Sequence, residues 1–276
     1  MGKESKIGFR KDNLKMSKFL RDLSWDEVKK LDRANTIVLV PIGSTEQHGY
    51  HMPLGTDFII AETVVRRVIE AIGDDIPLLA APTIPIGQSP EHMEYCGTIS
   101  LKPATLLALV EDIAGSLAHH GFKKVVFING HGGNTDILNA FSYDFRYRYN
   151  AYMYIIDTCS YILGDFEKPV KQESRKDTDF HAGEIETSAL MAITPELVKM
   201  DKAQPAIPVR YANADKMKFP GPVKMGWSSL DVSDSGVSGE PQYASIEKGK
   251  VLLDYVVEQA VLGIKEVYKW DGPACK

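Results

Sequence analysis

The chain has 276 residues, of which 44% are hydrophobic and 25% charged, and its formal net charge is -5 at pH 7. These values are ordinary for a globular protein, and the acidic balance argues against a nucleic-acid-binding surface, which needs a basic excess. No apolar run approaches the roughly 20 residues that cross a bilayer, and the charged start of the sequence lacks the apolar core of a secretory signal. We therefore expect a cytoplasmic protein that binds neither nucleic acid nor membrane.

Predicted strands and helices alternate along most of the chain. The elements expected, in chain order, are a helix over residues 24–35, a strand over 36–42, a helix over 59–72, a strand over 77–85, a helix over 103–120, a strand over 124–129, a helix to about residue 147, a strand over 151–157, and helices over 184–193 and 245–270. Such alternation predicts right-handed βαβ units, and therefore an α/β fold with a mostly parallel sheet and helices on both faces.

We expect one domain over residues 1–276, with a long irregular segment at 203–242 that is rich in proline and glycine. Irregular segments of this length are often functional, and this one is a candidate to reach the active site of a neighbouring subunit. In parallel α/β sheets, ligands bind beyond the carboxyl ends of the strands. The polar loops that follow the predicted strands are therefore the places to look for chemistry.

The loop after the first predicted strand carries Glu46, His48 and Asp57 among glycines, in the sequence GSTEQHGYHMPLGTD. Imidazole nitrogen and carboxylate oxygen are ligands that a first-row divalent ion accepts, and a carboxylate can bridge two ions through its two oxygens. A polar surface loop with unrelated side chains would give the same pattern. The spacing alone leaves both interpretations open.

The sequence NGHGGN follows the third predicted strand. A glycine-rich loop before a helix can bind phosphate, but this loop matches neither nucleotide-binding signature and has no lysine or arginine. The other interpretation makes His131 a metal ligand, with Gly132 and Gly133 leaving room for metal or substrate.

The sequence HAGEIETS contains His181, Glu184 and Glu186 at the start of a predicted helix. Acidic residues are favoured there by the helix dipole, so neither glutamate needs a function. The functional interpretation makes one glutamate a metal ligand and another group a proton-transfer residue.

The loop SPEHMEYCGT, after the second predicted strand, offers Ser89, His92 and Tyr95. These side chains could line a substrate pocket, belong to an interface, or lie in an ordinary loop. The sequence has no G-x-S-x-G elbow, so it gives no support for serine-hydrolase chemistry.

Four stretches together resemble the creatininase (creatinine amidohydrolase) family: VPIGSTEQHGYHMPLGTD, GQSPEHMEYCGTISL, FINGHGGN and HAGEIETS, in this order over roughly residues 36–200. The resemblance implies a three-layer α/β/α sandwich, a homo-oligomer that is often a hexamer, and two divalent ions per subunit (Zn, Mn or Fe). Creatininase shapes its pocket with tryptophans near the third motif, where this chain has none. The resemblance therefore points to a family member other than creatininase itself.

Carried onto this sequence, the family pattern places Glu46, Asp57 and His131 around one ion. His48 would bind the second ion, with Asp57 bridging the two. The family's further acidic ligand, two positions after the histidine that matches His131, corresponds to Gly133, which has no side chain to bind with.

Glu186 is the replacement that we expect for this missing ligand, because its ETS triplet matches the family pattern; Glu184 or water are the alternatives. His181 or Glu184 would carry a proton to the leaving group. Ser89, His92, Tyr95 and the two glycines 132 and 133 are the expected substrate-binding positions.

The expected function is hydrolysis of a small, cyclic, polar metabolite, in which a metal-bound hydroxide attacks the carbonyl of an amide, lactam or formamide. One alternative is ring opening of a cyclic diketone such as a dehydro-inosose, because family relatives include such a hydrolase. A second alternative is a metal-binding scaffold without catalysis, which Gly133 favours. A phosphate-binding enzyme is a weaker alternative, because the NGHGGN loop lacks a cation.

Overall fold

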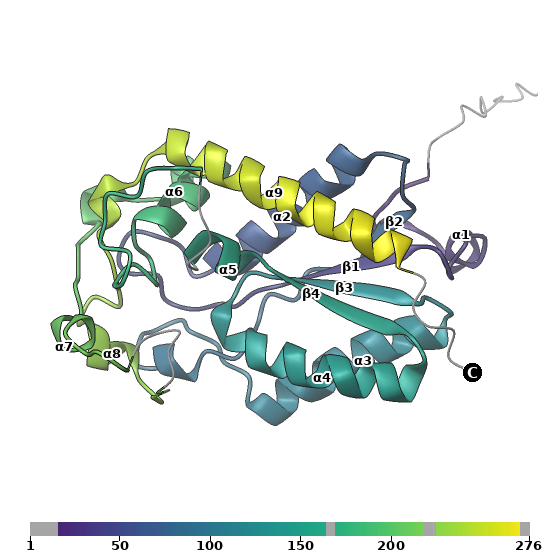
Figure 1. The fold of residues 1–276 in the computed structure, drawn as a ribbon, viewed down its shortest axis with the longest axis horizontal. Coiled ribbons are helices and arrows are strands. Elements are labelled where there is room, and N and C mark those ends of the chain that lie inside the picture. Colours follow the sequence, from purple (N-terminus) through teal and green to yellow (C-terminus); the bar gives the residue numbers. More distant parts are fainter. Residues whose placement is uncertain (1–15, 164–168, 218–222, 224, 271–276) are drawn as a thin grey trace, which may run out of the picture.

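A four-stranded parallel sheet forms the centre of the molecule in the computed structural model (Figure 1). The strand order is β2-β1-β3-β4, with bounds β1 Ile37–Ile42, β2 Leu78–Ala80, β3 Lys124–Asn129 and β4 Tyr152–Asp157. The structure describes residues 16–163, 169–217, 223 and 225–270. The predictions about the first residues of the chain fall outside these ranges.

The strands end level with one another at the edge where the polar loops begin. Ile42 pairs with Asn129, and Asn129 pairs with Asp157, so β1, β3 and β4 all finish at the same height. The chain runs from β1 outward to β2, then returns to β3 and runs outward to β4 on the other side. The neighbouring ends of β1 and β3 therefore form the topological switch point at which ligands bind in such sheets.

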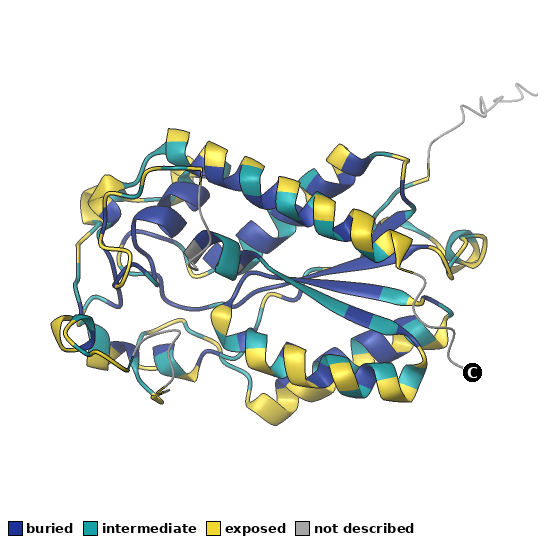
Figure 2. Ribbon diagram, viewed as in Figure 1, coloured by how far each residue is buried: buried dark blue, intermediate teal, exposed yellow. Residues whose placement is uncertain are grey.

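Helices cover both faces of the sheet because the strands are apolar on both sides. Ile37 and Leu39 belong to a core with α2, α6 and α9, whereas Val38 and Val40 belong to a core with α3 and α4. The burial pattern in Figure 2 follows this arrangement, with the buried sides of the helices turned toward the strands. The predicted α/β fold, a parallel sheet between two layers of helices, is confirmed.

The helices that the structure describes are α1 Trp25–Lys29, α2 Thr56–Ile72, α3 Pro103–His119, α4 Thr135–Tyr149, α5 Thr158–Leu163, α6 Glu184–Ile193, α7 Val209–Ala212, α8 Ser229–Val232 and α9 Ile246–Lys269. Two differences from the prediction matter for the site. Helix α2 begins at Thr56, so Asp57 lies in its first turn rather than in the loop before it. The second strand is short, because β2 pairs with β1 over three residues.

The segment 203–242 is largely irregular, as predicted, but it contacts its own chain. Ala206 forms a bridge with Gly239, and Ser238 forms one with His181. Ser238 therefore joins this segment to the residues before α6, and Figure 1 shows α7 and α8 at the same end of the molecule as α6. None of the described helices combines the length and the apolar character that a membrane crossing needs.

Candidate metal centre

Two loops and the first turns of two helices bring five side chains of metal-ligand type together at the ends of β1 and β3. Glu46 and His48 follow β1, Asp57 lies in the first turn of α2, and His131 follows β3 directly. Glu186 comes from the first turn of α6. A Cβ atom at residue 130 would lie 2.3 Å from the carbonyl oxygen of Asp57, so glycine at this position lets the β3 loop approach α2.

His131 faces two carboxylates on one side of the cluster. Its Nδ1 atom lies 3.2 Å from Oε2 of Glu46 and 3.2 Å from Oδ2 of Asp57. Its Nε2 atom donates to the carbonyl oxygen of Gln88 at 2.8 Å. The proton is therefore assigned to Nε2, and the lone pair of Nδ1 points between the two carboxylates.

His48 occupies the other side of Asp57. Its Nε2 atom lies 3.1 Å from Oδ1 of Asp57 and 3.6 Å from Oε1 of Glu186. Its Nδ1 atom donates to the carbonyl oxygen of Glu46 at 3.2 Å, which leaves the lone pair of Nε2 in the cluster. The two oxygens of Asp57 thus face two different histidines.

The chemistry of this donor set fits a metal ion. Nε2 of His48 and Oδ2 of Asp57 are buried atoms without a hydrogen-bond partner among the described residues. The lone pairs that two imidazoles offer once deprotonated, and those of three carboxylates, converge in a space from which water is largely excluded. Glu46, His48 and Asp57 are among the groups whose ligand atoms lie within 4.8 Å of one another. Divalent cations match such nitrogen and oxygen donors.

The shifted pKa values of Glu46, His48 and His131 indicate that this cluster favours a positive charge. Burial raises the pKa of Glu46 to about 7. Burial alone would lower the pKa of His131, but the carboxylates of Glu46 and Asp57 raise it to about 10. Asp57 and Glu186 likewise hold the pKa of His48 well above its usual value against the effect of burial. The carboxylates thus attract protons onto the histidines, and a bound cation would supply the same charge.

The chain matches the family model for creatininase, described as creatinine amidohydrolase, over residues 21–263. The chain belongs to the creatininase family. It is therefore an enzyme, a metal-dependent hydrolase of amide-type substrates, and not only a fold with acidic loops.

Relatives within the creatininase family act on different substrates. The chain is 34% identical to the mycofactocin precursor peptide peptidase of Mycolicibacterium smegmatis, over 83% of this chain and 84% of that protein. It is 28% identical to creatinine amidohydrolase of Pseudomonas putida, over 91% of this chain and 98% of that protein. It is 26% identical to 3-dehydro-scyllo-inosose hydrolase of Thermotoga maritima, over 90% of this chain and 84% of that protein.

Solved creatininase structures share the fold. A structure described as creatininase with Mn superposes with a TM-score of 0.72 at 25% identity, covering 92% of this chain and all of that one. A mutant creatininase of Zn-Zn type gives a TM-score of 0.74 at 26% identity, with the same coverage. Members of the family thus carry Mn or Zn on this fold.

Glu184 lies outside the metal-ligand cluster, whereas Glu186, two residues later in the HAGEIETS motif, lies within it. Its carboxylate accepts hydrogen bonds from the backbone N–H groups of Glu173 and Ser174, at 2.8 and 2.6 Å, and from Nζ of Lys248 at 2.6 Å. None of these partners belongs to the metal-ligand cluster, and Lys248 lies in α9. The contacts of Glu184 are those of a structural residue, and the expected proton-transfer role has no geometric support.

The expected substrate-binding residues fall into two groups. Ser89 is buried in the cluster, where its hydroxyl donates to Oε2 of Glu46, and His92 is buried beside it. Tyr95 instead donates its hydroxyl to the carbonyl oxygen of Ser233 at 2.8 Å, so it holds the loops together. The two glycines of the HGGN turn form the start of a 3-10 turn over Gly132–Asn134.

The packing around Gly133 leaves no room for a side chain at the position where the family has an acidic ligand. A Cβ atom there would lie 2.2 Å from the carbonyl oxygen of Gln88 and 2.5 Å from Nε2 of His131. The hydrogen bond between these two groups therefore occupies the space that a side chain would need. In this backbone conformation, a side chain at position 133 would have to displace the contact that orients His131.

Sequence reasoning missed the residues that reach the cluster from the irregular segment. Oγ of Ser229 lies 2.6 Å from Nδ1 of His92, and the ring of Trp227 meets the same imidazole edge-on at 6.1 Å between centroids. Gln47 also escaped notice, although its amide lies between His92 and His181. Nothing in the local pattern of residues 203–242 signals these contacts, because they depend on the path of the whole segment.

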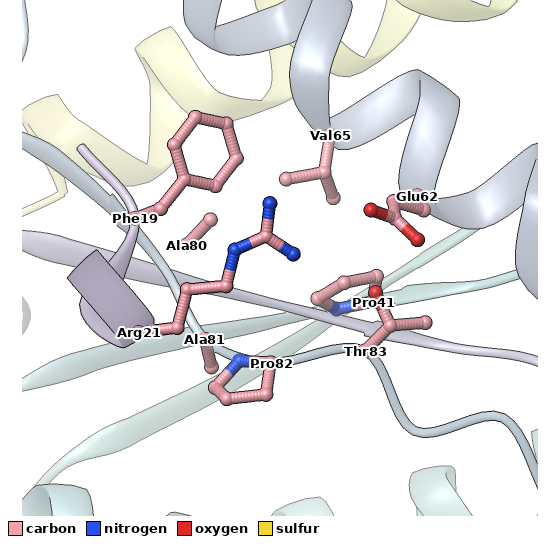
Figure 3. Close-up of a pocket in the computed structure, with 9 residues that line it drawn as sticks. All are labelled: Phe19, Arg21, Pro41, Glu62, Val65, Ala80, Ala81, Pro82 and Thr83. Carbon is pink, nitrogen blue, oxygen red and sulfur yellow. The ribbon is translucent and has the colours of Figure 1, made fainter. Parts of the chain in front are cut away.

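The hollow drawn in Figure 3 is a separate feature. It is lined by residues such as Phe19, Arg21 and Glu62, and none of its lining residues belongs to the metal-ligand cluster. Its volume of about 10 Å³ holds about one water molecule. This hollow is too small to be a substrate site.

Proposed function

We propose that this chain is a hydrolase with two divalent ions that cleaves the C–N bond of a small polar amide, lactam or formamide. One observation carries the proposal: Asp57 presents its two oxygens to two histidines, each of which has a free lone pair in a buried carboxylate cluster. A bridging carboxylate between two nitrogen ligands is a common arrangement for paired metal ions.

Glu46, His131 and Asp57 would hold one ion, and His48, Asp57 and Glu186 the other. The distances among these ligand atoms support this division, because Nδ1 of His131 and Nε2 of His48 face opposite oxygens of Asp57. When bound, the two ions would make a water molecule more acidic and stabilise negative charge on the substrate oxygen.

His181 is the group best placed to carry the proton of the attacking water to the leaving nitrogen. Its Nε2 atom donates to the carbonyl oxygen of Gln47 at 2.8 Å, so the lone pair of Nδ1 is left 3.9 Å from Oε1 of Glu46. Burial lowers the pKa of His181 to about 4, which keeps its imidazole neutral at pH 7 and able to accept a proton. The water oxygen bonds to the carbonyl carbon, the C–N bond breaks, and this proton passes to the leaving nitrogen.

The proposed class of bond, an amide-type C–N bond, is chosen from the reactions of several relatives and not from creatinine hydrolysis alone. Both the peptide peptidase and the creatinine amidohydrolase are named for reactions at an amide-type bond, and the inosose hydrolase is not. Ring opening of a cyclic diketone is the second candidate, supported by that last relative. The homo-oligomer expected from the family stays a prediction, and so does the cytoplasmic location.

The decisive measurement is the metal content of the purified protein, prepared without chelators, with Asp57→Asn as the variant. We expect about two Zn or Mn ions per wild-type chain and at most about one in the variant, because an amide is a weaker ligand and cannot bridge. Asp254→Asn is the matched control, because Asp254 is exposed and pairs with Arg67 on the surface. A wild-type protein without stoichiometric divalent ions would refute the proposal.

The substrate class is tested with the metal-loaded enzyme on amides, lactams, formamides, short peptides and cyclic diketones. We expect turnover in one of the nitrogen-containing classes and its loss in His181→Ala. Turnover confined to cyclic diketones would replace the proposed class by the second candidate. A metal-loaded protein that is inactive on the whole panel would favour the scaffold alternative.

A further inference from the structure

His92 is buried at the centre of a second set of contacts behind Glu46. It ends the 3-10 turn Pro90–His92, and its ring stacks on that of His181 at 4.3 Å between centroids, with 25° between the planes. Its Nε2 atom lies 3.3 Å from Oε1 of Glu46. Glu46, His92 and His181 form another group whose potential ligand atoms lie within 4.8 Å of one another, so the group could be taken for a further ion site.

The amide of Gln47 decides where His92 carries its proton. Oε1 of Gln47 accepts from the N–H of Gly49 at 2.8 Å, which fixes the orientation of the amide. Its Nε2 atom then donates to the carbonyl oxygen of Gly236 at 3.0 Å and to Nδ1 of His92 at 2.8 Å. A proton on Nδ1 would face an N–H group, so Nδ1 is the acceptor and Nε2 carries the hydrogen.

A neutral histidine with its hydrogen on Nε2 has no lone pair to offer a metal from that atom. The protonated Nε2 of His92 instead lies 3.3 Å from Oε1 of Glu46, and the other oxygen of Glu46 lies 3.2 Å from Nδ1 of His131. We propose that His92 is a positioning residue that holds Glu46 in the orientation in which it binds the first ion. This inference rests on the proposed two-ion function and adds the residue that orients one of its ligands.

Residues of the irregular segment 203–242 hold His92 and Gln47 on the side away from Glu46. Ser229, the first residue of α8, places its hydroxyl 2.6 Å from Nδ1 of His92, and Gly236 supplies the carbonyl that holds Gln47. Gly236 has a φ of 76°, and a Cβ atom there would lie 2.0 Å from Oε1 of Gln47. The position of residues 227–238 therefore sets the orientation of His92, and through it that of Glu46.

The test is the affinity of Mn²⁺ and Zn²⁺ for the full-length protein, measured by competition with a chelator. We expect His92→Ala to weaken one of the two ions by about 10- to 100-fold, the usual effect of losing a group that orients a metal ligand, while both ions still bind at saturation. His92→Gln should retain part of the affinity, because its side-chain amide can place an N–H near the position of Nε2. Ser229→Ala should cause a smaller loss than His92→Ala, because Gln47 still donates to Nδ1.

The matched control is His119→Ala, which removes an exposed histidine at the end of α3 and should leave both affinities unchanged. Thermal unfolding of the metal-free variants separates misfolding from a change in metal binding. Two results would overturn the inference: unchanged affinities in His92→Ala, or the loss of a whole ion at saturation, which would make His92 a ligand. If the wild-type protein binds no ions, the proposed function itself is refuted, and this result is obtained before any variant is compared.

Discussion

Oε1 of Glu186 lies 3.6 Å from Nε2 of His48, on the side of the imidazole that also faces Asp57. The other carboxylate oxygen of Glu186 accepts from the backbone N–H of Ala182 at 2.6 Å, which fixes the carboxylate at the start of α6. Burial opposes ionisation of Glu186, but the neighbouring His48 outweighs burial and lowers the pKa. An ionised carboxylate is therefore held beside His48 and Asp57, where the second ion of the proposed pair lacks the family's further acidic ligand.

Glu186→Gln is expected to lower the bound divalent ions from about two to about one per chain, because an amide oxygen is a poorer ligand than a carboxylate. The measurement is metal content after dialysis, together with affinity for Zn²⁺. Glu184→Gln is the matched control two residues away on the same helix. It should keep both ions but lower the free energy of unfolding by about 1–3 kcal/mol, because Lys248 loses a charged partner. The same ion content in both variants would contradict the assignment of Glu186.

Gly133→Ala is expected to weaken metal binding by about 10- to 100-fold, because the added Cβ atom would displace either Gln88 or His131. Overpacking should also lower the free energy of unfolding by about 1–3 kcal/mol. Gly263→Ala is a control in α9, where the nearest atom to a new Cβ is a side-chain carbon at 3.8 Å. Affinity is measured by chelator competition and stability by chemical denaturation.

A sharper version places glutamate at position 133 in the Glu186→Gln background. We expect no recovery of the second ion, because the contact between Gln88 and His131 fills that space. Recovery would show that the loop can rearrange, and that the glycine is not required by packing.

Ala182 has a φ of 54°, in the left-handed region that side chains rarely adopt, and it is fully buried. Ala182→Gly should leave the free energy of unfolding within about 1 kcal/mol, because relief of backbone strain offsets the added freedom of the unfolded chain. Ala182→Val should lose about 2 kcal/mol or more and weaken the second ion, because a β-branched residue disfavours this φ and Ala182 orients Glu186. Denaturation and metal competition on both variants check the pair. Equal behaviour of glycine and valine would exclude backbone strain as the cause.

Asp179 gives a prediction about pH. Burial raises its pKa to about 7, and Oδ1 has no hydrogen-bond partner among the described residues. A folded-state pKa above the unfolded value of 3.8 means that the favourable contribution of protonated Asp179 is complete below pH 4 and is lost as the pH rises through 7. Asp179→Asn removes the ionisation, so its advantage over the wild type should grow between about pH 4 and pH 7 and then level off.

The upper limit of this gain is about 4 kcal/mol, which corresponds to three pKa units. Denaturation curves of the metal-free proteins at several pH values measure it. A difference between Asn and Asp that does not change with pH would show that Asp179 is ionised throughout this range.

The sequence by itself determined the order of strands and helices and the loops that carry the chemistry. The runs 36–42 and 124–129 are apolar on both faces, which only a strand covered on both sides satisfies, and they became β1 and β3. Because parallel strands end at one edge, the sequence alone places the loops with Glu46, His48 and His131 together. Local composition was sufficient for this, because each motif follows its strand directly.

The tertiary structure decided which of two glutamates faces the cluster. Glu184 and Glu186 are two residues apart on a helix, so they point about 200° apart, and either could have met His48. Packing of α6 against α9 turned Glu184 toward Lys248 and left Glu186 for His48. Only the tertiary structure showed that Ser229 and Gly236 reach His92 and Gln47, because these long-range contacts leave no periodic signal in the sequence.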